Sequence, residues 1–135
     1  MTTSKVKKEE ALILALIERW AEAVRSEDID TVVQQHSSDI LMFDLPGPVQ
    51  IEGIKAYRKS WNPLFRWIRG SGRFELRDIR VTAGRDVAFA TTLLDCRGKE
   101  SGTKLEKIAG RLTFGFRKID GELLVTHEHH SEPSA

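Results

Sequence analysis

Residues 120–131 read DGELLVTHEHHS, a turn signal followed by a β-type run that holds three of the four histidines of the chain. An Asp-Gly pair between two β-type runs is typical of a hairpin. Because side chains alternate between the two faces of a strand, His127, His129 and Ser131 are predicted to share one face. We expect these three to lie in solvent or to line a polar cavity. His130, on the other face, is expected to meet solvent or an interface.

The rest of the chain divides into a helical half and a β-rich half. Strand-like runs cover 73–83, 87–97, 104–119 and 123–131. Helical spacing of apolar residues covers 9–25 and 54–68, with a short helix predicted over 28–35, a short buried strand over 40–43 and a loop over 44–48. Pro63 lies inside the third helical pattern and should kink or split it. This order predicts an α+β fold, with N-terminal helices packed on a curved, mostly antiparallel sheet.

Composition indicates one globular domain, predicted over 9–133 after a flexible N-terminus at 1–8. The 135 residues include 21 basic and 20 acidic ones, for a net charge of +1, so we expect no binding to nucleic acid or to an anionic membrane. Cys96 is the only cysteine, which excludes an intramolecular disulfide and favours a cytoplasmic location. No apolar run approaches the roughly 20 residues that span a bilayer.

Three local patterns occur in order along the chain. They are Arg19-Trp20 with Ala23-Val24 and Glu27-Asp28-Ile29-Asp30, then Phe43-Asp44-x-Pro46 leading to Gly53, and finally Asp120-Gly121 with His127-x-His129-x-Ser131-x-Pro133. The first two resemble segments of ketosteroid isomerases, and the third resembles the closing strand of SnoaL-like proteins and of the calcium/calmodulin-dependent protein kinase II association domain. These three groups of proteins belong to the nuclear transport factor 2-like superfamily. The resemblance implies a cone-shaped fold that encloses a pocket, and a homodimer.

Asp44 is the strongest candidate for a catalytic group. It follows a run that should be buried, and a carboxylate at the mouth of an apolar cavity can act as a base. The resemblance also places a general base here, whereas the alternative is a turn residue bonded to its own loop. Trp20 stands where the isomerases place an oxyanion tyrosine, but it has only an N–H to donate, and it can equally be a core residue. The late strand around 112–116 carries no acid to supply the second oxyanion donor of those enzymes.

His127 and His129 allow three interpretations. They are acid–base or hydrogen-bonding groups of the pocket, or metal ligands together with His36 or Asp44, or structural residues bonded to the backbone or to Ser131. Since no cysteine or carboxylate lies at ligand spacing, we expect no metal, and nothing in the sequence calls for a cofactor.

Arg111 is predicted to face the same pocket from the neighbouring strand. The hairpin should bring it level with His129, and Arg beside histidines and Ser131 makes an anion or carboxylate site. The alternative is an ordinary exposed arginine. Phe114 and Phe116, on the opposite face of that strand, are expected to form an apolar surface for a second subunit.

Tyr57, Trp61 and Trp67 occupy the third helical pattern, where they either wall an apolar pocket or fill the core. Two functional classes follow. One is an isomerase, cyclase or lyase in which Asp44 takes a proton from a hydrophobic carbonyl compound while His129 or Trp20 polarises the enolate. The other is a non-catalytic ligand-binding or oligomerisation module.

The pocket of the non-catalytic module would hold a small carboxylate or anion at Arg111 and the C-terminal histidines. The ligand is therefore expected to be a small hydrophobic or carboxylate-bearing molecule. The fold does not decide between the two classes, because this scaffold carries many functions.

Overall fold

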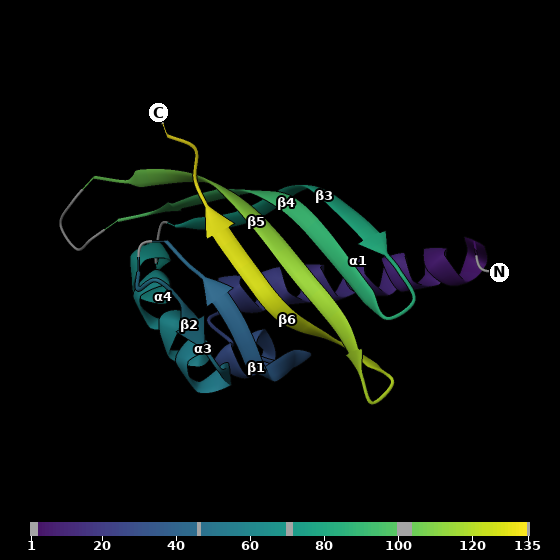
Figure 1. Cartoon of the computed structure of the whole chain (residues 1–135). Coiled ribbons are helices and arrows are strands. Elements are labelled where there is room, and N and C mark those ends of the chain that lie inside the picture. The colour runs from purple at the N-terminus through teal and green to yellow at the C-terminus, as the bar shows by residue number, and fades with distance from the viewer. Residues whose placement is uncertain (1–2, 46, 70–71, 100–103, 135) are drawn as a thin grey trace.

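The computed structural model describes residues 3–45, 47–69, 72–99 and 104–134. Its elements are α1 (Thr3–Arg25), α2 (Ile29–Val32), β1 (His36–Phe43), β2 (Ile51–Glu52), α3 (Ile54–Ser60), α4 (Asn62–Ile68), β3 (Arg73–Ala83), β4 (Val87–Gly98), β5 (Glu106–Ile119) and β6 (Glu122–Ser131). Figure 1 shows the helices gathered on one side of a single sheet, which confirms the predicted α+β class. Pro46 and residues 100–103, which belong to predicted loops, lie outside the described residues.

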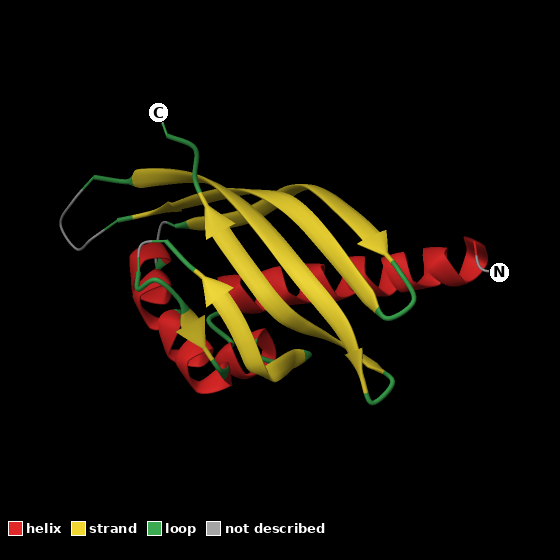
Figure 2. Cartoon of the chain, viewed as in Figure 1, coloured by secondary structure: helices red, strands yellow, loops and turns green. Residues whose placement is uncertain are grey.

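The six strands are ordered β2-β1-β6-β5-β4-β3 (Figure 2). Every neighbouring pair is antiparallel except β1 and β6, which are parallel. The sheet is thus mostly antiparallel, as predicted. Because β1 and β6 run in the same direction, they end side by side. Phe43, the last residue of β1, pairs with His129 near the end of β6.

The hairpin between β5 and β6 turns at Asp120 and Gly121, as the sequence predicts. Both residues have positive φ, 52° and 78°, which is the backbone of a type I′ turn. Ile119 and Glu122 therefore pair directly across the turn. This turn sets the register in which β6 begins.

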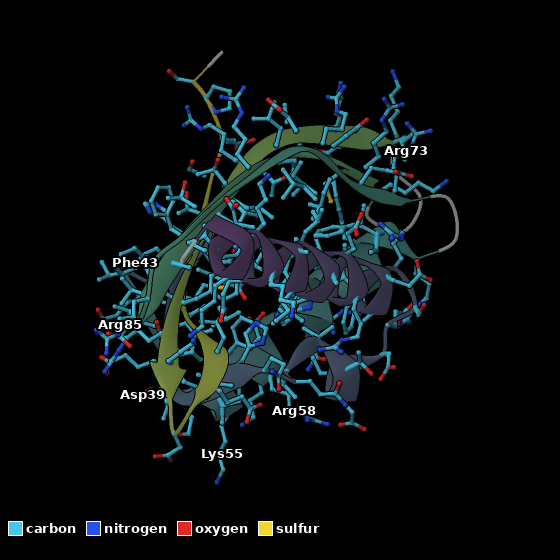
Figure 3. The ribbon with its side chains drawn as sticks, turned by 90° about the vertical axis from the view of Figure 1, so that its right-hand side faces the viewer. Asp39, Phe43, Lys55, Arg58, Arg73 and Arg85 are labelled. Atoms are coloured by element: carbon cyan, nitrogen blue, oxygen red, sulfur yellow. The ribbon has the colours of Figure 1, made fainter. Side chains whose placement is uncertain are left out.

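Helix α1 lies in the hollow of the curved sheet, as Figure 3 shows in a view turned by 90°. Its buried face is formed by Ile13, Ile17, Trp20 and Val24, each at most 2% exposed, and it packs against β3. The spacing of three or four residues is that of an amphipathic helix. The helix begins at Thr3, earlier than the apolar pattern indicates. The segment 3–8 contains no Gly or Pro to stop the helix, and its three lysines are good helix formers. None of the described helices is long and apolar enough to cross a bilayer.

Helices α3 and α4 are separate, because Pro63 begins a new helix rather than continuing the old one. The predicted split is confirmed. Helix α4 lies close to the end of β4, where a Cβ on Gly98 would come within 2.4 Å of the Trp67 ring. Lys99 N donates to Trp67 O at 2.8 Å, so the backbone also ties α4 to the sheet. A glycine at this position lets Trp67 pack directly on the strand.

The inner face of the sheet forms the core together with the helices. Leu112, Phe114 and Phe116 of β5 are at most 2% exposed and point inward. The expectation that the two phenylalanines form a surface for a second subunit is therefore wrong. The exposed apolar residues of the sheet lie on the outer face of β4, with Phe89 50% and Leu93 46% exposed.

Candidate functional site

A cavity of about 470 Å³ lies between the inner face of the sheet and helices α3 and α4. This size suits a small organic ligand. Most of the lining is apolar and comes from Trp61, Pro63, Leu64, Trp67, Phe74, Leu94, Cys96, Ile108 and Leu112. The polar lining side chains are those of Asp44, Ser60, Glu106, His130 and Ser131.

Asp44 is brought to the cavity by the parallel pairing of β1 with β6. Since Phe43 pairs with His129, the next residues of each strand, Asp44 and His130, lie level with each other. The Oδ1 atom of Asp44 accepts a hydrogen bond from Leu45 N at 2.8 Å and lies 3.2 Å from His130 Nδ1. Asp44 thus lines the cavity and bonds to its own loop, so both positions considered from the sequence occur together.

His130 lies between two carboxylates, and its side chain is only 13% exposed. Its Nε2 atom lies 3.1 Å from Glu128 Oε1, while Nδ1 faces Asp44. Burial alone lowers the pKa of this imidazole, but the hydrogen bonds and charges of the two carboxylates outweigh burial and raise the pKa to about 9. At neutral pH His130 is therefore an imidazolium with a proton on each nitrogen. The expectation that it faces solvent or an interface is wrong.

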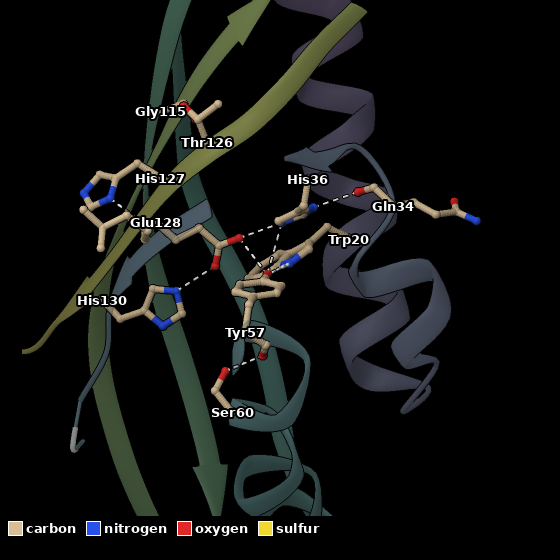
Figure 4. Close-up of polar contacts among 11 residues, drawn as sticks. Trp20, Gln34, His36, Tyr57, Ser60, Gly115, Thr126, His127, Glu128 and His130 are labelled. Carbon is tan, nitrogen blue, oxygen red and sulfur yellow. Dashed lines mark hydrogen bonds and ion pairs between the residues drawn. The ribbon is translucent and has the colours of Figure 1, made fainter. Parts of the chain in front are cut away.

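Glu128 is fully buried, and three side chains surround its carboxylate (Figure 4). Oε1 accepts from His130, whereas Oε2 accepts from Tyr57 Oη at 2.7 Å and lies 2.7 Å from His36 Nε2. Burial raises the pKa of this carboxyl, but hydrogen bonds from His130 and His36 and the charges of these rings lower the pKa to about 2. Glu128 is therefore ionised inside an otherwise apolar core.

The groups around Glu128 are fixed in turn by their own partners. His36 Nδ1 donates to Gln34 O at 2.7 Å, because a carbonyl can only accept. Trp20 Nε1 donates to Tyr57 Oη at 3.1 Å. Burial and the charge of Glu128 raise the pKa of Tyr57 well above its usual value, so the phenol keeps its proton and donates it. We call Trp20, His36, Tyr57 and Glu128 the Glu128 cluster; it joins α1, β1, α3 and β6.

Trp61 lines the cavity with its ring, whereas its indole nitrogen is buried. The side chain is 3% exposed, and Nε1 has almost no exposed surface and no hydrogen bond of normal geometry among the residues that the structure describes. Its N–H nevertheless acts as a donor toward Tyr57 and opposes the rise in the pKa of that phenol. A ligand oxygen could take this N–H only if the indole ring turned.

A β-bulge in β6 decides which histidines face the cavity. Phe116 pairs with Val125 and Gly115 with His127, so Thr126 is an extra residue without a partner on β5. Val125 and Glu128 are both fully buried although they are three positions apart, a spacing that would put them on opposite faces of a regular strand. Past the bulge, the even-numbered residues therefore point inward.

His127, His129, Ser131 and Arg111 do share one face, as the alternation predicts, but it is the outer face of the sheet. Arg111 Nε donates to Ser131 Oγ at 3.1 Å, and His127 Nδ1 lies 2.7 Å from Leu41 O. The ring of Phe43, which Figure 3 shows on the outer side, packs edge-on against both histidines.

Of these residues, only Ser131 also lines the cavity. Arg111, His127 and His129 do not, contrary to the expectation that they face the pocket. Their surroundings are the outer face of the sheet, where an internal anion site cannot form.

The remaining predicted residues divide between the cavity and the core. Asp44, Trp61 and Ser131 line the cavity, whereas Trp20 and Tyr57 are buried in the Glu128 cluster. Within the described ranges, no three side chains of His, Cys, Asp or Glu are grouped so as to hold a metal ion. His36, considered from the sequence as a metal ligand together with His127 and His129, is hydrogen-bonded to Glu128 instead.

Sequence reasoning missed Glu128, considered His36 only as a metal ligand, and placed His130 at solvent or an interface. The apolar alternation of Leu112 with Phe114 indicates which face of β5 is inner. The residues opposite them on β6 are then inner as well. That signal does not reveal the bulge, and without the bulge His127 and His129 would occupy those places.

A family model for the SnoaL-like domain matches residues 13–135. The chain belongs to the SnoaL-like family. The comparison with curated proteins found no match. A solved NTF2-like protein of unknown function from Pseudomonas putida KT2440 is 34% identical, with a TM-score of 0.84 over 96% of this chain and 89% of that chain.

Two more distant structures show the same fold as this SnoaL-like domain. A ketosteroid isomerase-like protein from Erwinia carotovora atroseptica SCRI1043 is 19% identical, with a TM-score of 0.77 over 94% of this chain and 98% of that chain. An NTF2-like protein with a cystatin-like fold from Novosphingobium aromaticivorans is 17% identical, with a TM-score of 0.74 over 95% and 82%.

Proposed function

We propose that this SnoaL-like domain binds a small, largely apolar carbonyl compound and that Asp44 is the general base of an isomerase, cyclase or lyase reaction. The position of Asp44 supports the proposal. Its carboxylate lies at the polar end of an apolar cavity, with Oδ1 held by Leu45 N and next to His130. Among the described residues, none makes a hydrogen bond to Oδ2, which leaves this oxygen available to a ligand.

The chemistry begins with proton abstraction by Asp44 Oδ2 from the carbon next to the carbonyl. The electron pair of the broken C–H bond moves to the carbonyl oxygen and gives an enolate. In an isomerisation, Asp44 then returns the proton to another carbon. A base placed beside the reacting carbon typically accelerates such a step by about 10²–10⁴-fold.

Trp61 is the best donor for the enolate oxygen. The sequence favoured Trp20 or His129, but Trp20 already donates to Tyr57, and His129 lies outside the cavity. The Nε1–H of Trp61 makes no hydrogen bond of normal geometry among the described residues, and a turn of its ring, which lines the cavity, would present this donor to the enolate oxygen. One such donor is worth about 10²–10³-fold in well-studied enzymes.

Deuterium exchange at the α-carbon of 2-tetralone tests this proposal. The wild-type protein should accelerate the exchange in D₂O, followed by NMR, above the rate in buffer. Asp44→Asn should reduce the acceleration by about 10² or more in a protein that remains folded by circular dichroism. Asp39→Asn is the matched control, because Asp39 lies on β1, the strand that Asp44 follows, but is exposed.

Binding is measured separately by the quenching of tryptophan fluorescence, because Trp61 and Trp67 line the cavity. If 2-tetralone binds but the wild-type protein leaves the exchange rate at the buffer value, the proposed reaction is wrong. A non-catalytic ligand-binding domain would then be the better description.

A further inference from the structure

The cavity-facing pair of Asp44 and His130 is supported from behind by a residue that does not line the cavity. Glu128 occupies the inner face of β6, opposite Phe114, and its Oε1 atom lies 3.1 Å from His130 Nε2. We propose that Glu128 is a positioning residue that keeps His130 an imidazolium oriented toward Asp44. The structural part of this inference stands on its own, and its consequence for the reaction rests on the proposed function.

The Glu128 carboxylate is divided between two tasks. Oε2 is held by Tyr57 Oη and His36 Nε2, both at 2.7 Å, and neither of these two side chains lines the cavity. Oε1 is left to His130. Because Oε2 is anchored on the far side, the carboxylate cannot turn away from His130 without losing two short hydrogen bonds.

The elements around His130 contribute two charged groups and two neutral ones. Asp44 follows β1 and faces Nδ1, and Glu128 on β6 faces Nε2. Trp61, between α3 and α4, lies with its ring centroid 6.0 Å from the imidazole, and Leu112 of β5 pairs with His130. A carboxylate at each nitrogen requires a proton on each nitrogen, which is the charged form of the ring.

The imidazolium of His130 orients the proposed base. Its Nδ1–H lies 3.2 Å from Asp44 Oδ1 and can hold that oxygen, which leaves Oδ2 to take a proton from a ligand. Removing the charge of Glu128 weakens the hold on the imidazolium proton, so His130 becomes neutral at a lower pH. Asp44 then loses its cationic neighbour over the range where the wild-type pair is intact.

Long-range ¹H–¹⁵N NMR of the histidine rings tests the inference without any ligand. In the wild-type protein, both nitrogens of His130 should stay protonated from pH 6 to pH 8, in agreement with the pKa of about 9. Glu128→Gln should lower the titration midpoint of His130 by about one to three pH units. His127 is an internal control, because its ring lies on the outer face with Nδ1 near Leu41 O. Its ring signals should be the same in the wild-type protein and in the variant at each pH.

A His130 that titrates near the usual value of 6.5 in the wild-type protein overturns the inference. An unshifted midpoint in a folded Glu128→Gln variant does so as well. If that variant does not fold, the wild-type titration still decides, because it needs no substitution.

The 2-tetralone exchange rate separates this inference from the proposed function. If the function is right, Glu128→Gln should move the alkaline limb of the pH–rate profile, which follows the loss of the His130 charge, to lower pH, whereas a purely structural loss would lower the rate equally at every pH. If the wild-type protein shows no exchange but His130 remains an imidazolium, the function fails and the positioning role stands.

Discussion

The Nδ1 atom of His130 lies 3.2 Å from the Oδ1 atom of Asp44, so strand β6 and the loop after β1 meet at one wall of the cavity. The parallel pairing of β1 with β6 causes this contact, since Phe43 and His129 are partners in the ladder. A polar pair is thereby held at the end of an apolar cavity by backbone hydrogen bonds. The rest of the site depends on the Glu128 cluster behind it.

Stability should depend on pH through His130 and Glu128. The folded pKa of His130, about 9, lies above the usual 6.5, so its stabilisation is complete below pH 6.5 and is lost as the pH rises toward 9. The folded pKa of Glu128, about 2, lies below the usual 4.5, so its stabilisation is complete above pH 4.5 and is lost as the pH falls toward 2. The melting temperature should therefore be highest between these limits.

Circular dichroism melting curves across the pH range measure this effect. Between pH 6.5 and pH 9 the free energy of unfolding should fall by an amount on the order of 3 kcal/mol. This figure describes the interaction of His130 with Asp44 and Glu128 and is not added a second time for Glu128. His130→Asn should flatten the alkaline decline, whereas His129→Asn, on the outer face, should retain it. An identical decline in both variants would place its origin elsewhere.

Tyr57→Phe should destabilise the protein by roughly 1–3 kcal/mol, measured by urea unfolding. The substitution removes one donor from Glu128 Oε2 and leaves Trp20 Nε1 without its acceptor. A double-mutant cycle with Trp20→Phe should show coupling, since part of the cost is the unpaired indole N–H. Additive effects of the two substitutions would contradict the hydrogen bond between these side chains.

We expect a homodimer that forms through the outer face of the sheet. Val87, Phe89 and Leu93 of β4 are 59%, 50% and 46% exposed, and a self-complementary contact between two copies would cover them. Sedimentation at micromolar concentration should show a dimer that Phe89→Lys weakens. Val49→Lys, in a loop where Val49 is 92% exposed, is the control. A strictly monomeric wild-type profile would remove this expectation.

A chelator should leave the melting temperature unchanged. His127 and His129 have no third ligand beside them among the described residues, and His36 is bonded to Glu128. Differential scanning fluorimetry with and without EDTA measures the effect. A large loss of stability on chelation would show that a metal contributes to folding.

Local signals in the sequence predict much of the fold. Pro63 separates α3 from α4, and the Asp120-Gly121 pair forms the hairpin turn, because both effects depend on backbone geometry near one residue. The first half of β1 is not predicted, since His36 to Asp39 is polar. It becomes a strand through pairing with β6, which lies far along the chain.

The site is predicted less well than the fold. Asp44 reaches the cavity as expected, because it directly follows a buried strand. His130 was assigned to the wrong side, because strict alternation carries no information about an unpaired residue such as Thr126. The inner position of Glu128 also contradicts the usual placement of acids on a sheet. It is stable here only because three donors surround its carboxylate.

The unpaired Thr126 also determines which polar side chains the closing strand offers to the cavity. A pairing of Thr126 with Gly115 would remove the bulge and shift the rest of β6 by one residue, turning His127 and His129 toward the cavity and Glu128 and His130 toward solvent. The segment HEHHS therefore carries two alternative polar surfaces, and the register of one strand selects between them. A shift of register alone would thus change which residues face the cavity, without any substitution in the segment.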